Sequence, residues 1–122
     1  DFGRRRLQRL DEADWHLDET AVAELEPLLL KLCAHYFLHA KSAGEPVDPV
    51  ARFHLRNGAR LERINWLGNT SSKGLVQSSG MLVNYVYDRK TVTQNHEAYV
   101  NHGEIISSAA VQQLLKAREI AA

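Results

Sequence analysis

The sequence predicts an α+β fold that is mainly helical, with at least one strand near residues 59–67. Apolar residues recur every three or four positions in several stretches, which is the spacing of one helix face, and polar capping residues precede several of them. Ile64 and Trp66, by contrast, are spaced as on one face of a strand. A chain of 122 residues, 44% of them hydrophobic, is long enough to bury a core.

The first helical region begins at Asp18-Glu19-Thr20, whose polar side chains can cap a helix over residues 21–26. Pro27 is costly inside a helix but tolerated in its first turn, so it predicts the start of a second helix. That second helix is expected to run to about His39. Residues 42–46, which are rich in glycine, proline and serine, form the connector that follows.

A short helix and a strand come next. Asp48-Pro49 combines a strong N-cap residue with a proline at the first helical position, which predicts a helix through Phe53-His54-Leu55. Asn57-Gly58 ends this helix, because both residues accept a positive φ at little cost. The chain can turn there into the strand expected over residues 59–67.

Two further helices are predicted beyond the strand. The first runs from about Ser72 to Tyr87, although Gly74 and Gly80 each cost about 1 kcal/mol relative to alanine inside a helix. A polar loop over residues 88–103 then leads to a final helix that starts near Glu104. The apolar residues that set the helical spacing are Leu75, Val76, Leu82, Val83 and Val86 in the first helix and Ile105, Ile106, Ala109, Ala110 and Leu114 in the second.

Composition excludes several classes of function. Fifteen basic and fifteen acidic residues leave no net charge, so neither nucleic acid nor an anionic membrane is an expected partner. Cys33 is the only cysteine, which excludes an internal disulfide and a cysteine metal cluster and favours a reducing, cytoplasmic location. The longest apolar run, near Leu28–Leu32, is too short to span a membrane, and no signal peptide opens the chain. The chain begins with Asp1 and its only methionine is Met81, which indicates a piece of a longer protein.

Five segments, in this order and spacing, resemble the C-terminal region of malonyl-CoA decarboxylases. They are residues 48–59 (DPVARFHLRNGA), Leu61-Glu62-Arg63-Ile64-Asn65-Trp66, Gly74-Leu75, Gly80-Met81-Leu82-Val83-Asn84-Tyr85 with Tyr87, and Asn95-His96-Glu97-Ala98-Tyr99, the last similar to the bacterial branch. The likeness spans most of residues 25–115, and the combination is highly specific.

The resemblance implies the C-terminal portion of a GNAT-like acyl-CoA domain. Residues 1–122 are then one segment of a longer catalytic domain, whose acyl-CoA-binding segments and catalytic serine lie upstream, in a protein expected to form a homo-oligomer through a separate helical domain. The implied enzyme is a carboxy-lyase that converts malonyl-CoA to acetyl-CoA and carbon dioxide without a metal or organic cofactor. His54 matches the family's catalytic histidine, and Tyr87 matches a tyrosine that supports it. Either the serine or His54 donates the proton.

Two alternatives come from other classes of function. One is a GNAT-type acyltransferase that delivers an acyl group to an amine, and the other is a non-catalytic helical module that packs on a partner chain. Without the resemblance, a histidine between Phe53 and Leu55 is more often structural than catalytic.

Other side chains that could bind a ligand are expected to be structural or solvated. His35 and His39 share a helix face at a spacing that metal ligands use, but no acidic residue lies between them. His96 and His102 lie in the polar loop, where solvated side chains are the better interpretation. Arg4-Arg5-Arg6 could meet coenzyme A phosphates, yet a short basic run at a chain end is usually solvated or disordered.

Overall fold

The computed structural model describes residues 2–116, and these residues form an α+β fold with more helix than strand. The predicted fold class and the strand predicted near residues 59–67 are therefore confirmed. The elements in chain order are α1 (Phe2–Leu7), η1 (Gln8–Asp11), η2 (Trp15–Leu17), α2 (Glu19–His39), β1 (Lys41–Ser42), β2 (Glu45–Pro46), α3 (Pro49–Arg56), β3 (Arg60–Asn65), α4 (Ser72–Ser78), β4 (Leu82–Val86), α5 (Val92–His102) and α6 (Ala109–Lys116).

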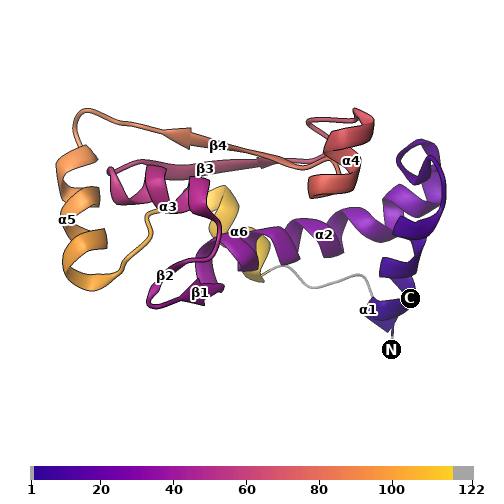
Figure 1. Ribbon diagram of the computed structural model, residues 1–122, viewed down its shortest axis with the longest axis horizontal. Coiled ribbons are helices and arrows are strands. Elements are labelled where there is room, and N and C mark those ends of the chain that lie inside the picture. Colours follow the sequence, from indigo (N-terminus) through magenta and orange to yellow (C-terminus); the bar gives the residue numbers. More distant parts are fainter. Residues whose placement is uncertain (1, 117–122) are drawn as a thin grey trace.

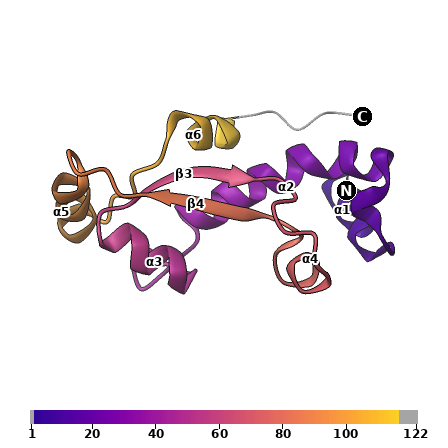
Figure 2. The same cartoon turned by 90° about the horizontal axis from the view of Figure 1, so that it is seen from above.

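The long helix α2 lies along a two-stranded ribbon formed by β3 and β4 (Figure 1). Seen from above, α6 lies on one side of this ribbon and α3 and α4 on the other, while α5 packs on α3 at one end (Figure 2). The main core is enclosed by these elements, and its buried members are Ala34, Leu38, Ala51, Leu55, Leu61, Ile64, Tyr99 and Val111. Within residues 2–116, no helix combines the length and the apolar composition that crossing a membrane requires.

The β3–β4 ribbon is antiparallel and carries an irregularity near its middle. Arg60 lies opposite Val86 and Asn65 opposite Leu82, and the register shifts between Leu61 and Arg63. An extra residue in one strand reverses the side that the following side chains face. Leu61 and Ile64 are consequently both buried, at 0% and 7% exposure, although they are three positions apart.

The predicted break at Pro27 is wrong, because α2 continues through it from Glu19 to His39. The proline has no N–H, so the helix lacks one backbone hydrogen bond at that turn. Leu25 and Leu28 on either side of it are buried, and their packing outweighs the loss. The predicted cap at the start of the helix is confirmed, since Asp18 accepts hydrogen bonds from two backbone N–H groups of the first turn.

The helix predicted from Ser72 to Tyr87 is confirmed in its first part, which is α4, and wrong in its second part, which contains β4. It ends at Ser78, because Ser79 and Gly80 follow with φ of 52° and 80°, in the left-handed region. The apolar residues beyond Gly80 form β4 and pair with β3 instead of continuing the helix.

The prediction of a polar loop over residues 88–103 is also wrong, because this segment contains α5. Only Asn95 and Tyr99 of α5 are buried, one turn apart, so the helix has a narrow buried stripe and an otherwise polar surface. Such a helix gives little apolar periodicity to read in the sequence.

The final helix begins at Ala109 and not near Glu104. The residues before it run extended beside β3, where the Leu61 N–H donates to the Ile106 carbonyl and the Ser108 N–H donates to the Leu61 carbonyl. The Ser108 hydroxyl then accepts a hydrogen bond from the Val111 N–H at 3.2 Å and caps α6.

Candidate active site

The helix α3 places His54 at the edge of the core. Its first turn is capped by Asp48, whose Oδ1 accepts the N–H groups of Val50 at 3.0 Å and Ala51 at 2.9 Å. Ala51 and Leu55, one turn apart, are 0% and 2% exposed and fix the buried face of the helix. His54 precedes Leu55 by one position, so its side chain leaves the helix beside the core and is half-buried.

The turn after α3 fixes the direction in which the chain enters β3. The Asn57 side-chain amide donates to the Phe53 carbonyl at 2.7 Å, and Gly58 has φ of 93°. The buried Asn95 of α5 donates through Nδ2 to the Gly58 carbonyl at 3.1 Å. A side chain at Gly58 would overlap the backbone of Val92 at the start of α5, so the close approach of α5 requires glycine there.

His54 is held by contacts with Tyr85 of β4 and with Tyr87, which directly follows that strand. Its Nδ1 lies 2.6 Å from the Tyr87 hydroxyl oxygen, within hydrogen-bond distance. Its ring stacks on Tyr85, with ring centroids 4.5 Å apart and an interplanar angle of 25°. Either the Tyr87 hydroxyl donates to a bare Nδ1 or a protonated Nδ1 donates to the hydroxyl oxygen, and both arrangements leave Nε2 for another partner.

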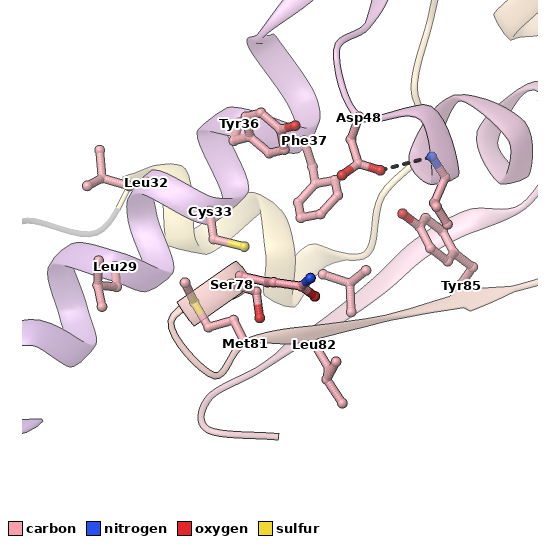
Figure 3. A pocket seen from close by; sticks show the side chains of 13 residues that line it. Leu29, Leu32, Cys33, Tyr36, Phe37, Asp48, Ser78, Met81, Leu82 and Tyr85 are labelled. Atoms are coloured by element: carbon pink, nitrogen blue, oxygen red, sulfur yellow. Dashed lines mark hydrogen bonds between the residues drawn. The ribbon is translucent and has the colours of Figure 1, made fainter. Parts of the chain in front are cut away.

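A largely apolar pocket of about 600 Å³ lies between α2 and β4, next to the start of α3. Tyr85 reaches it on the side of Asp48, and Cys33 enters it from α2 (Figure 3). Among the described residues, His54 and Tyr87 are not part of its lining, so Tyr85 separates the histidine from the pocket. The lining residues are Leu29, Leu32, Cys33, Tyr36, Phe37, Asp48, Val50, Gln77, Ser78, Met81, Leu82, Val83 and Tyr85.

Burial suppresses ionisation in this pocket. Burial, together with the smaller effect of the nearby Asp48 carboxylate, raises the pKa of the Cys33 thiol to about 11. Burial also raises the pKa of Tyr85, with smaller contributions from Asp48, Cys33 and Tyr87. The Tyr85 hydroxyl oxygen is buried and has no hydrogen-bond partner among the described residues. At neutral pH both groups are therefore uncharged.

The other histidines lie apart from this site. His35 and His39 are exposed on α2, with ring centroids 5.1 Å apart. His96 on α5 bonds through Nδ1 to the Arg56 carbonyl at 2.6 Å, which ties α5 to the end of α3. Within residues 2–116, no three histidine, cysteine, aspartate or glutamate side chains are grouped to hold a metal ion.

The expectation of a solvated or disordered basic run at the N-terminus is wrong for one of its three arginines. These residues belong to α1, in which Arg4 and Arg5 are exposed while Arg6 is 5% exposed.

The sequence did not single out Tyr85. It belongs to the segment that carries the resemblance, but nothing local distinguished it from a core tyrosine. The available signal was its position two residues before Tyr87, because side chains two apart on a strand lie on the same face. A strand in place of a helix over residues 82–86 would have placed both tyrosines beside His54.

Similar folds occur in crystal structures of malonyl-CoA decarboxylases. The protein from Rhodopseudomonas palustris matches 91% of this chain at a TM-score of 0.87 and 47% identity, and this chain covers 26% of it. The protein from Agrobacterium vitis matches 92% at a TM-score of 0.86 and 45% identity, with 28% of it covered. The fold thus defines an α+β segment of the kind found in these structures.

Sequence comparisons agree with the structural ones. The chain matches the family of the malonyl-CoA decarboxylase C-terminal domain over residues 2–122, and it belongs to this family. Mitochondrial malonyl-CoA decarboxylase from Anser anser anser is 42% identical over 84% of this chain, and that from Rattus norvegicus is 37% identical over 87%. The chain spans 20% and 22% of these two proteins, about a fifth of their length.

Proposed function

We propose that this chain is the C-terminal part of a longer protein that converts malonyl-CoA to acetyl-CoA and carbon dioxide. Family membership supports the reaction, and the observation that carries the site is the 2.6 Å contact between His54 Nδ1 and the Tyr87 hydroxyl. In this proposal His54 is catalytic and Tyr87 supports it. The serine that pairs with His54 comes from the part of the longer protein that precedes this segment.

The proposed reaction breaks the bond between the malonyl carboxylate and the α-carbon. The electron pair of that bond moves into the thioester and forms an enolate, and carbon dioxide departs. The enolate oxygen must be stabilised by donors or positive charge, and the α-carbon must then take up one proton to give acetyl-CoA. The thioester itself accepts the electrons, so the proposal includes no metal or organic cofactor.

His54 suits this chemistry because, within residues 2–116, only Nδ1 of its two ring nitrogens makes a hydrogen bond. With Nδ1 held by Tyr87, Nε2 is available to a serine hydroxyl or to the departing carboxylate. In one version the serine protonates the α-carbon while His54 positions the carboxylate, and in the other His54 delivers the proton. Both versions require the imidazole to be held in one orientation.

Assembly and location remain predictions. We propose that the longer protein forms a homo-oligomer through its other regions, which sedimentation of that protein tests. The sequence favours the cytoplasm, whereas the relatives from goose and rat are named as mitochondrial proteins. Cell fractionation of the longer protein distinguishes the two locations.

The test of the reaction uses the longer protein and malonyl-CoA labelled in its free carboxyl group. The proposal predicts labelled carbon dioxide and an equal amount of acetyl-CoA. A parallel reaction with an added amine acceptor measures acyl transfer. Transfer of an intact malonyl group to the amine without release of labelled carbon dioxide would overturn the proposal.

A further inference from the structure

Tyr85 packs against the flat face of the His54 ring, whereas the Tyr87 hydroxyl makes its hydrogen bond with the Nδ1 atom at the edge of the ring. The hydrogen bond lies at the Nδ1 edge of the imidazole and leaves the face of the ring to other contacts. The Tyr85 ring lies against the imidazole face at 4.5 Å and 25°, which is a stacked geometry. The two tyrosines together fix both the position and the plane of the imidazole.

The backbone holds Tyr85 firmly in this place. It lies opposite Leu61 in the β3–β4 ribbon, and Leu61 is 0% exposed in the main core. Tyr85 lies near the end of β4 and Tyr87 directly follows that strand, and the rings of both tyrosines contact the ring of His54. The Phe53 ring, which is itself exposed, also meets the imidazole edge-on, at 5.2 Å and 80°.

The ring and the hydroxyl of Tyr85 have separate surroundings. The ring contacts His54, whereas the hydroxyl oxygen is buried and has no hydrogen-bond partner among the described residues. A phenylalanine at this position would keep the stacked ring and remove only the hydroxyl. The chain therefore offers a matched pair of substitutions that separates the two parts of the side chain.

We propose that Tyr85 is a positioning residue for His54, and that it acts through the face of its ring and not through its hydroxyl. This inference rests on the proposed catalytic role of His54. Loss of the ring frees the imidazole plane, so Nε2 spends less time aimed at its reaction partner. The chemical step slows, while the binding of substrate is unchanged.

The kinetic test compares Tyr85→Phe and Tyr85→Leu in the longer protein, with His54→Ala measured alongside. Tyr85→Phe is expected to keep kcat within about twofold, and Tyr85→Leu to lower kcat by about tenfold with little change in KM. If Tyr85→Leu does not fold, Tyr85→Met replaces it, because methionine also fills the space without a ring face. An equal loss in Tyr85→Phe and Tyr85→Leu, or normal kcat in a folded variant without the ring, overturns the proposal.

A spectroscopic test does not depend on activity. The NMR signal of a proton above the face of an aromatic ring is shifted upfield. The His54 ring protons should therefore show an upfield chemical shift caused by the stacked Tyr85 ring. In protein with isotope-labelled histidine, this upfield shift should persist in Tyr85→Phe and disappear in Tyr85→Leu or Tyr85→Met. An unchanged His54 signal in the ringless variant contradicts the positioning role. Full activity in His54→Ala, by contrast, would refute the proposed function itself.

Discussion

Replacing Gly58 with alanine tests the contact between the end of α3 and α5. Gly58 has φ of 93°, and its carbonyl accepts a hydrogen bond from the buried Asn95. A Cβ at this position would lie 2.7 Å from Val92 Cγ2 and would also overlap the Val92 carbonyl oxygen. The obstacle is partly backbone, so it cannot be removed by a change of side-chain rotamer alone.

The size of the effect follows from three contributions. A left-handed backbone costs a non-glycine residue about 1–2 kcal/mol, and the lower entropy of the unfolded alanine variant returns about 0.4–1 kcal/mol. Displacement of Val92 adds a cost on the order of 1–2 kcal/mol, the range for steric overlap in a packed interior. The expected loss for Gly58→Ala is therefore roughly 2–3 kcal/mol, or about 8–12 °C in Tm at about 4 °C per kcal/mol.

Gly44→Ala is the matched control for this prediction. Gly44 also has a positive φ, of 80°, but a Cβ there would meet nothing within 4 Å. Its replacement should cost only the backbone strain, about 1 kcal/mol. Thermal unfolding followed by circular dichroism measures both variants. Equal Tm values for Gly58→Ala and Gly44→Ala would refute the close approach of α5 to the turn after α3.

Three further predictions concern the site and the pocket. Tyr87→Phe should lower turnover by about fivefold, which is the effect of losing one hydrogen bond of about 1 kcal/mol and is smaller than the effect of removing His54. Equal inactivity of the two folded variants would give Tyr87 a direct chemical role. Folding raises the pKa of Cys33 from its ordinary value of 9.0 to about 11, so the contribution of the protonated thiol to stability is complete below pH 9.0 and is lost as the pH rises through about 11. Urea unfolding should show that Cys33→Ala reduces this decline, and an unchanged pH profile would contradict the raised pKa. Decarboxylation by the longer protein should survive a chelator, whereas loss of activity that one metal ion restores would contradict the cofactor prediction.

The parts of the fold that the sequence predicted are those that local chemistry determines. Asp18 and Asp48 cap α2 and α3 through their own side chains, so each helix start was readable from a few neighbouring residues. Gly58 marked the turn into β3 for the same reason, because glycine has no Cβ and adopts a positive φ without steric cost.

The errors occurred where distant contacts decide the structure. The apolar residues of β4 fit a helix as well as a strand over so short a run, and the pairing of β4 with β3 determines the outcome. The α5 helix is held by Asn95 and Tyr99, two buried side chains that contact Gly58 and Glu45 respectively. Neither partner can be inferred from the spacing within the helix.

The candidate site was predicted in part, and only through the resemblance. His54 and Tyr87 are 33 positions apart, and no local pattern connects them. Their proximity requires α3 to pack beside β4, which the predicted helix over residues 72–87 would not have produced. Tyr85 was missed for the same reason, because its contact with His54 exists only when residues 82–86 form a strand.

The central claim is that His54 acts in the proposed decarboxylation. The most direct test is the rate at which His54→Ala, made in the longer protein, releases carbon dioxide from malonyl-CoA, with His35→Ala on the exposed face of α2 as the control. The proposal predicts a fall by a factor on the order of a hundred or more for His54→Ala, with little change in Tm, and normal activity for the control. Near-normal turnover in a folded His54→Ala variant would contradict the claim.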